Sequence, residues 1–257
     1  MEDLKMVNFV GAGCGAPDLI TLRGAELLRS ADVIIYAGSL VNPELLKYAK
    51  EGCEIYNSAK MTLDEVIEVI EKSEKDGKNT VRLHTGDPSV YGAIREQMDR
   101  LDALKIYYAV CPGVSSFCGA AAALRAEYTL PDISQSVIIT RMAGRTPVPD
   151  RESIRSFAAH KATMVVFLSA GMTEKLQEEL IAGGYCEDTP AAIVYKASWP
   201  DEKVMRCTVG TLHKTAEENG IKNLALITVG GFLGDEYSLS KLYDPAFTTA
   251  FRKGSEE

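Results

Sequence analysis

Residues 7–16 read VNFVGAGCGA, and this stretch sets the pattern for the first half of the chain. The run 7–10 predicts a β-strand, and the three glycines after it suit a turn whose backbone approaches a ligand closely. The turn formally matches the dinucleotide fingerprint GxGxxA. The match is poor, because residues 17–20 separate the turn from the next predicted helix, which Thr21 caps, and because Asp32 precedes the second strand. A ligand-binding turn and a purely structural turn both remain open.

Two later segments repeat this passage from strand to turn. Residues 83–92, LHTGDPSVYG, and residues 111–116, CPGVSS, each continue a predicted strand. Ligands of parallel sheets bind at the carboxyl ends of the strands, so both turns are candidates for ligand contact. The alternative is local, since Asp87 could cap the following helix and Ser115 or Ser116 could be only an N-cap. No P-loop lysine accompanies these turns, which argues against triphosphate binding.

Strand-like runs alternate with amphipathic runs in the first half, which predicts an α/β fold with mostly parallel pairing. Thr62 and Glu65 have the spacing of a capping box and predict the start of a helix. We predict strands over 7–10, 33–36, 80–83 and 106–110, and helices over 21–30, 43–50, 62–76, 92–104 and 116–125. The Pro112-Gly113 break indicates a boundary between domains 1–112 and 113–257.

The second half is less regular. The runs on either side of Trp199-Pro200-Asp201 predict a hairpin, which makes this sheet partly antiparallel. We predict strands over 136–140, 163–168, 191–195, 203–209 and 224–229, and helices over 150–159, 173–182 and 210–218. The tail from Arg252 to Glu257 is expected to fray.

The composition restricts the function further. With 46% hydrophobic and 25% charged residues, the 257-residue chain is typical of a globular protein. No apolar run approaches the roughly 20 residues that cross a bilayer, and no signal peptide is recognisable, so we expect a cytoplasmic protein without a membrane partner. The net charge of -8 argues against nucleic acid as a partner. The six cysteines form no CxxC pair, so no metal site is expected.

The order of the three turns resembles the tetrapyrrole methylases. The motifs are residues 10–15 with 18–24, then Thr85-Gly86-Asp87-Pro88, then residues 112–116. Two further stretches, residues 140–149 (TRMAGRTPVP) and 194–203 (VYKASWPDEK), look like the branch of this family that acts on precorrin-4. The resemblance covers nearly the whole chain.

This resemblance implies two α/β/α domains, the first with a mostly parallel sheet and the second with a mixed sheet, and an active-site trough between them. It implies that S-adenosylmethionine binds there and leaves as S-adenosylhomocysteine. Carried over by motif, the cofactor contacts would be Thr85, Gly86, Asp87, Val90, Ser115, Ser116, Leu168, Ala197 and Ala225. One departure is Cys14, where many relatives have proline.

The resemblance also implies the acceptor, which is carbon 11 of precorrin-4 or of its cobalt form, methylated to precorrin-5 during cobalamin biosynthesis. A substrate with many carboxylates needs cations, and Arg141, Arg145 and Lys196 are the candidates, although each could be a solvated surface charge. His84 could move a proton or be structural, so no catalytic residue is assigned. The resemblance implies a homodimer.

Four alternatives stay open at this point. The nearest is a sister methylase that acts on another carbon of a precorrin or of uroporphyrinogen. A more distant relative modifies ribosomal RNA, which the acidic pI of about 5.1 disfavours. A nicotinamide-dependent reductase rests on GxGxxA alone, and a non-catalytic tetrapyrrole-binding module would leave the cofactor turns unexplained. Binding of labelled S-adenosylmethionine against NADH would separate these classes.

Overall fold

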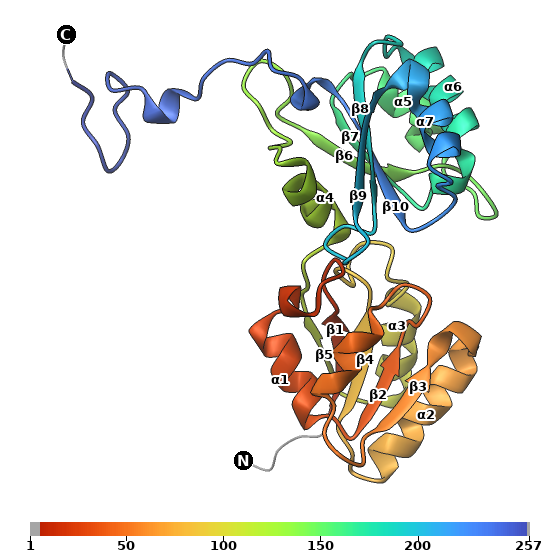
Figure 1. Ribbon diagram of the computed structural model, residues 1–257. Helices are drawn as coiled ribbons and strands as arrows, with labels where there is room; N and C mark the ends of the chain where they lie inside the picture. Colours follow the sequence, from red (N-terminus) through yellow and green to blue (C-terminus); the bar gives the residue numbers. More distant parts are fainter. Residues whose placement is uncertain (1–5, 256–257) are drawn as a thin grey trace. The chain divides into compact units, whose positions relative to one another are not determined.

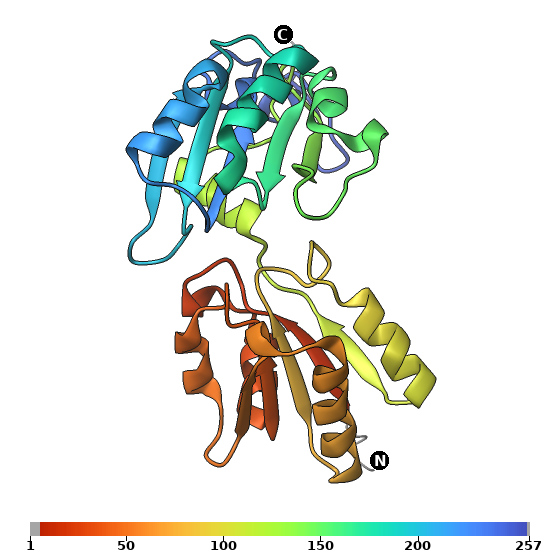
Figure 2. The ribbon, with the colours of Figure 1, turned by 90° about the vertical axis from the view of Figure 1, so that its right-hand side faces the viewer.

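The computed structural model describes residues 6–255, which form two compact units. Unit 1 comprises the described residues up to Ala122 together with Lys196–Glu202, and unit 2 comprises Ala123–Tyr195 with the described residues from Lys203 onward. Figure 1 and Figure 2 show the elements of each unit. A boundary between separately folding domains at residue 112 stays a prediction.

Unit 1 is built on five parallel strands in the order β3-β2-β4-β1-β5. They are β1 (Val7–Gly11), β2 (Val33–Tyr36), β3 (Glu54–Asn57), β4 (Thr80–His84) and β5 (Tyr108–Cys111). The connection that leaves β1 goes toward β2, and the connection that leaves the adjacent strand β4 goes toward β5, in the opposite direction. In open α/β sheets, ligands bind at the carboxyl ends of strands where connections diverge in this way.

Helices cover both faces of this sheet. Helix α1 (Leu22–Ser30) packs on one face, and α2 (Leu63–Lys75) and α3 (Arg95–Leu104) pack on the other. Successive strand residues point to opposite faces, so Ile34 lies in the core under α1 and Ile35 in the core under α2 and α3. Each fully buried aliphatic side chain contributes roughly 1.5–3 kcal/mol. The predicted parallel sheet with helices on both faces is confirmed for this unit.

Unit 2 has a mixed sheet in the order β6-β7-β10-β8-β9. Its strands are β6 (Val137–Arg141), β7 (Thr163–Phe167), β8 (Pro190–Tyr195), β9 (Lys203–Thr208) and β10 (Ala225–Val229). Only β6 and β7 pair in parallel, and the other neighbours are antiparallel. The predicted hairpin, formed by β8 and β9, and the mixed character of the sheet are both confirmed.

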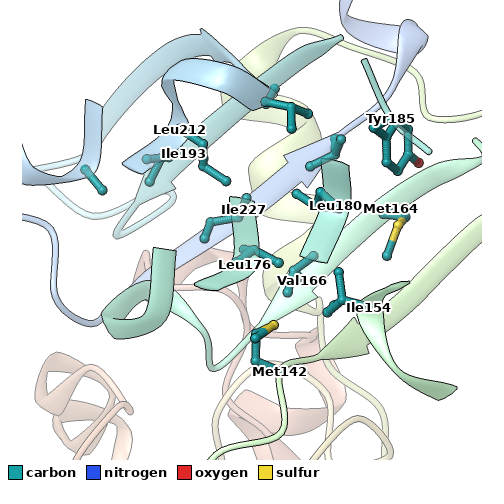
Figure 3. Packing of buried hydrophobic residues seen from close by; sticks show 14 of the residues in the cluster. Met142, Ile154, Met164, Val166, Leu176, Leu180, Tyr185, Ile193, Leu212 and Ile227 are labelled. Carbon is teal, nitrogen blue, oxygen red and sulfur yellow. The ribbon is translucent and has the colours of Figure 1, made fainter. Parts of the chain in front are cut away.

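Three helices cover one face of the mixed sheet: α5 (Ile154–Ala158), α6 (Thr173–Gly183) and α7 (Leu212–Glu218). Figure 3 shows Leu176 and Leu180 of α6 packed over the buried side chains of the strands, among them Met164, Val166, Ile193 and Ile227. This core holds β7 and β10 in place, and the candidate residues Leu168 and Ala225 lie at the ends of these two strands.

Several predicted elements begin or end elsewhere in the structure. The helix predicted over 43–50 is a 3-10 helix, Pro43–Tyr48, and edge strand β3 was not predicted because its half-buried residues show no apolar alternation. The helix predicted from residue 92 begins at Arg95, since Tyr91 and Ala93 have φ of 56° and 49°. The capping box at Thr62 is confirmed. Within residues 6–255, no helix has the length and apolar character of a membrane span.

Candidate functional site

The turns after β1, β4 and β5 meet through three glycines, Gly11, Gly86 and Gly113, which we call the glycine junction. A Cβ atom added to Gly11 would lie 2.5 Å from Cα of Gly113 and 2.6 Å from the carbonyl oxygen of Gly86. A Cβ atom added to Gly113 would lie 2.2 Å from the same oxygen. No side chain fits at positions 11 and 113 at such distances, so glycine at these two positions allows the three backbones to approach one another.

Hydrogen bonds tie the first two turns together. The amide of Gly86 donates to the carbonyl of Gly13 at 3.0 Å, and the amide of Gly13 donates to the carbonyl of Gly86 at 3.3 Å. The amide of Ala12 donates to the carbonyl of His84 at 2.7 Å. Gly13 and Gly86 have φ of 82° and 61°, which side-chain-bearing residues rarely adopt. The first turn is therefore bonded to the second turn at the carboxyl ends of β1 and β4. A 3-10 helix, Pro17–Leu19, separates it from α1, unlike a dinucleotide turn that opens directly into a helix.

Asp87 joins the second turn to the third. One carboxylate oxygen, Oδ2, accepts a hydrogen bond from the amide of Gly113 at 2.9 Å, and the other accepts from the amide of Ser89 at 2.8 Å and from the Ser89 hydroxyl. Burial raises the pKa of Asp87, but these hydrogen bonds outweigh it and hold the pKa below its ordinary value. Because α3 begins only at Arg95, Asp87 does not cap it.

The remaining predicted contacts of this region lie beside the junction. A Cβ atom on Gly86 would be 3.5 Å from Cα of Ser115 and 3.5 Å from the amide nitrogen of Ser116, which begins α4 (Ser116–Leu124). Val90 is half-buried and its amide donates to the Asp87 carbonyl at 3.2 Å. The buried hydroxyl of Thr85 has no hydrogen-bond partner among the described residues. The structure thus brings the candidates of the second and third turns together.

The segment Lys196–Glu202 packs against the first turn within unit 1. Ala197 is buried, and its Cβ lies 3.4 Å from where a Cβ of Gly119 would be. The Ser198 hydroxyl accepts from the amide of Ala16 at 2.9 Å and lies 3.4 Å from Sγ of Cys14. Sequence reasoning missed this contact, because nothing in the residue pattern pairs Cys14 with a serine 184 positions away.

Lys196, a candidate for substrate contact, is engaged within its own segment. Its Nζ lies 2.6 Å from a carboxylate oxygen of Asp201 and 5.4 Å from the centroid of the Trp199 ring. The indole of Trp199 in turn lies against Gly15, where an added Cβ would be 2.2 Å from Cδ1. Lys196 therefore shapes the segment that carries Ala197.

Leu168 and Ala225 lie at the ends of two neighbouring strands in the mixed sheet of unit 2, β7 and β10. Leu168 follows β7, is 61% exposed and has a φ of 52°. Ala225 opens β10, which pairs with β7 so that Ile227 is opposite Val166. That antiparallel register brings the start of β10 and the end of β7 to the same edge. The two residues therefore belong to one neighbourhood of unit 2.

The two arginines of the segment Arg141–Pro149, which we call the arginine loop, have different surroundings. The guanidinium of Arg141 donates to the carbonyls of Met142 and Thr146, each at 3.2 Å, and to that of Pro147 at 2.8 Å. Arg141 thus joins three backbone carbonyls of its own loop. Arg145 is exposed and makes no hydrogen bond or ion pair with the residues that the structure describes. Of the two, Arg145 is the one whose charge is available to a ligand.

His84 lies in β4, beneath the second turn. The ring is buried and lies tilted against the Phe9 ring at a centroid distance of 6.0 Å, and its Nε2 has no partner among the described residues. Burial, assisted by the positive charge of Arg82, lowers the pKa of His84 to about 3. A ring with this pKa is neutral near pH 7 and is a weak base, so its surroundings favour a structural role over proton transfer.

Comparisons with known proteins identify a family and several similar proteins. Residues 6–213 match the family of tetrapyrrole (corrin/porphyrin) methylases. The chain is 51% identical, over all of both sequences, to a cobalt-precorrin-4 C(11)-methyltransferase of Methanocaldococcus jannaschii. An X-ray structure of a cobalamin biosynthetic enzyme, cobalt precorrin-4 methyltransferase, is 46% identical with a TM-score of 0.88, over 90% of this chain and 96% of the other.

A third comparison involves a bound product. The uroporphyrin-III C-methyl transferase of Thermus thermophilus, solved in complex with S-adenosylhomocysteine, is 26% identical with a TM-score of 0.74. The match covers 89% of this chain and 93% of the other. With the family match extending over most of the chain and the relatives matched along their whole length, this protein belongs to the tetrapyrrole methylase family.

Proposed function

We propose that this protein transfers the methyl group of S-adenosylmethionine to carbon 11 of cobalt-precorrin-4, which gives cobalt-precorrin-5 during corrin-ring biosynthesis. The observation that carries the proposal is the glycine junction, joined by Asp87, at the point where the connections of the parallel sheet diverge. The two similar proteins with 46–51% identity both act, by name, on the cobalt form of precorrin-4.

The cofactor contacts that we propose in unit 1 are those of the turns and of the packed segment: Thr85, Gly86, Asp87, Val90, Ser115, Ser116 and Ala197. Glycine leaves the backbone accessible to a ligand, and the unpartnered hydroxyl of Thr85 offers a donor and an acceptor to a nucleoside. From unit 2 we propose Leu168 and Ala225, whose common sheet edge supports a joint role.

Methyl transfer from S-adenosylmethionine needs little help from acid or base groups. S-adenosylmethionine supplies a methyl group that its sulfonium already activates. The chain must therefore orient the donor against the ring carbon, and orientation of this kind can supply roughly 7–11 kcal/mol. Rigid turns suit that task. His84, neutral and with a pKa of about 3, does not fit the role of proton acceptor.

For the acceptor we propose Arg145 as the principal contact to a substrate carboxylate. Its guanidinium is exposed on a loop that Arg141 and two prolines stiffen, and a planar guanidinium pairs well with carboxylates. Arg141 supports the loop, and Lys196 supports the segment next to the first turn. Both act on the substrate through the segments that they hold.

We also propose that the protein forms a homodimer in the cytoplasm. The C-terminal segment 237–251 exposes six large apolar side chains: Tyr237, Leu239, Leu242, Tyr243, Phe247 and Phe251. Exposed apolar surface of this kind is typical of an interaction site. The six free cysteines suit a reducing compartment. Sedimentation at micromolar concentration tests the dimer, and a monomer of 27.9 kDa would count against it.

A single-turnover assay tests the reaction. The protein is mixed with methyl-labelled S-adenosylmethionine and either cobalt-precorrin-4 or metal-free precorrin-4, and the position of the new methyl group is determined. We expect label at carbon 11 and faster transfer to the cobalt form. Label at another ring carbon would assign the protein to a sister reaction, and binding of NADH without binding of S-adenosylmethionine would refute the proposal.

A further inference from the structure

The connection between β4 and α3, residues 85–94, is held in an unfavourable conformation at its far end. Tyr91 and Ala93 have φ of 56° and 49°, which are costly for residues with a side chain. Between them, Gly92 folds back so closely that a Cβ atom would lie 2.1 Å from the carbonyl oxygen of Pro88. Such a conformation persists only where neighbouring groups fix it. Asp87 fixes the near end of this connection, so the far end requires another support.

A line of buried polar groups provides that support. Gln97 in α3 is 5% exposed, and its Nε2 donates to the carbonyl of Ala93 at 2.9 Å. Its Oε1 accepts from Nε of Arg82 at 3.0 Å. Arg82 is 6% exposed, and its Nη1 donates to the carbonyl of Ile35 at 3.1 Å. Hydrogen bonds thus run from β2 through β4 and α3 to the strained residue Ala93.

The direction of this line is fixed by Arg82. Burial lowers the pKa of Arg82 to about 10, so the guanidinium is still charged near pH 7 and can only donate. The oxygen of the Gln97 amide must therefore face Arg82, which turns the amide nitrogen toward Ala93. The N-cap of α3, Ile94, has no side-chain cap of its own. Gln97 thus binds the carbonyl of Ala93, the residue that lies just before the N-cap and itself has a positive φ.

We propose that Gln97, oriented by Arg82, is a positioning residue that holds the far end of the cofactor turn and so sets the placement of Asp87 and Val90. This inference rests on the proposed function, since it assumes that the turn binds S-adenosylmethionine. The buried amide transmits the fixed position of the sheet to a loop whose far end, residues 91–94, carries strained residues and no buried polar side chain of its own.

Gln97→Glu separates the two hydrogen bonds of the amide. The carboxylate still accepts from Arg82 and gains an ion pair, but it cannot donate to the Ala93 carbonyl. We expect the Kd for S-adenosylhomocysteine, measured by calorimetry, to rise roughly tenfold, as the loss of one buried hydrogen bond allows, with the Tm changed little. Amide hydrogen exchange should accelerate in residues 88–93 and stay unchanged in β1 and β5. Gln97→Met, which keeps the volume and loses both bonds, should weaken binding at least as much.

Two further variants make the result specific. Ala93→Gly in the Gln97→Glu background should restore most of the affinity, because glycine adopts a positive φ without support. Gln177→Glu in α6, whose Oε1 accepts from the amide of His213 at 3.0 Å, keeps its contact and is the matched control. Unchanged Kd and unchanged exchange in Gln97→Glu and Gln97→Met would overturn the inference. So would loss of folding in both variants, because Gln97 would then serve the whole unit.

The wild-type protein separates this inference from the proposed function. If the wild-type protein binds S-adenosylhomocysteine and the Gln97 variants bind it equally well, only the positioning role fails. If the wild-type protein binds no S-adenosylhomocysteine, the proposed function fails and the positioning role fails with it.

Discussion

The glycine junction of unit 1 and the arginine loop of unit 2 are both candidate contact regions, yet they are built in opposite ways. In the junction, backbone packs on backbone, and the position of Gly113 leaves no room for a single carbon atom. In the arginine loop, one side chain, Arg141, reaches inward to three carbonyls and leaves Arg145 in solvent. The first region is fixed by the absence of side chains and the second by the presence of one.

This difference matches what each ligand would require. A methyl donor must be held in line with its acceptor, where small misplacements lose much of the rate, and a rigid junction suits that need. The carboxylate chains of a macrocycle are flexible, and a mobile guanidinium can meet them. Substitutions in the junction should therefore change folding and cofactor affinity together, whereas substitutions in the loop should change acceptor affinity alone.

The largest effect is expected for Gly113→Ala. The new Cβ would lie 2.2 Å from the Gly86 carbonyl oxygen, so the turns must separate. We expect the free energy of unfolding in urea to fall by about 3 kcal/mol and binding of S-adenosylhomocysteine to fall more than tenfold. Gly77→Ala is the control, because Gly77 has a φ of 64° but nothing within 4 Å of the added atom. It should cost about 1 kcal/mol of stability with normal binding. Normal binding by Gly113→Ala would contradict the junction.

Asp87→Ala should come next. It removes the acceptor of the Gly113 and Ser89 amides and so loosens the second turn from the third. We expect a loss of about 1–3 kcal/mol in the binding free energy of S-adenosylhomocysteine, with a smaller loss of Tm. Asp64→Ala, which removes an exposed ion pair with Arg100 at 2.8 Å, should leave the affinity unchanged. Unchanged kinetics in Asp87→Ala would reduce this carboxylate to a local turn former.

The stability of the protein should depend on pH through His84, which lies in β4 beneath the glycine junction. His84 has a folded pKa of about 3, below its ordinary value of 6.5, so the unfolded chain binds the proton more tightly between these values. Stability should therefore fall as the pH drops below 6.5, by about 1.4 kcal/mol per pH unit, which is about 2 kcal/mol at pH 5. Urea unfolding of the wild-type protein and of His84→Phe at pH 7.5 and 5.0 measures this difference. The exposed His160→Gln is the control, and an equal pH response in His84→Phe would remove His84 as the cause.

The sequence is informative about the junction for a physical reason. Close backbone approach demands glycine, so the three turns stand out in the sequence as Gly-rich ends of predicted strands. The contact between the turns is harder to predict from the sequence, because the order β4-β1-β5 places side by side strands that are not consecutive in the chain. Gln97 carries no sequence signal at all. A buried glutamine in a helix has no characteristic spacing, and the late start of α3 follows from two residues with positive φ.

The arginine loop shows where sequence reasoning stops. Arg141 and Arg145 look equivalent as two cations four residues apart, and only the structure separates the one that binds carbonyls from the one that faces solvent. The family pattern selected Lys196 for its charge, whereas the structure pairs it with Asp201. Whether a charged side chain on a loop is paired or exposed depends on the residues that the fold places around it, and local sequence patterns do not describe these residues.

The smallest effect, and the one that most sharpens the comparison, is expected for Arg145→Ala. This variant removes an exposed charge with no partner among the described residues, so folding should be unaffected. The KM for cobalt-precorrin-4 should rise about fivefold, as loss of one charge-assisted contact near solvent allows, while the Kd for S-adenosylhomocysteine stays the same. Arg145→Lys should recover only part of the loss, because an ammonium cannot pair in two places with a carboxylate. Arg151→Ala, which removes another exposed arginine just beyond the loop, is the control. Equal effects of Arg145→Ala on both ligands would make the loop a structural part of the cofactor site, and no effect on either would exclude it from the contact with the acceptor.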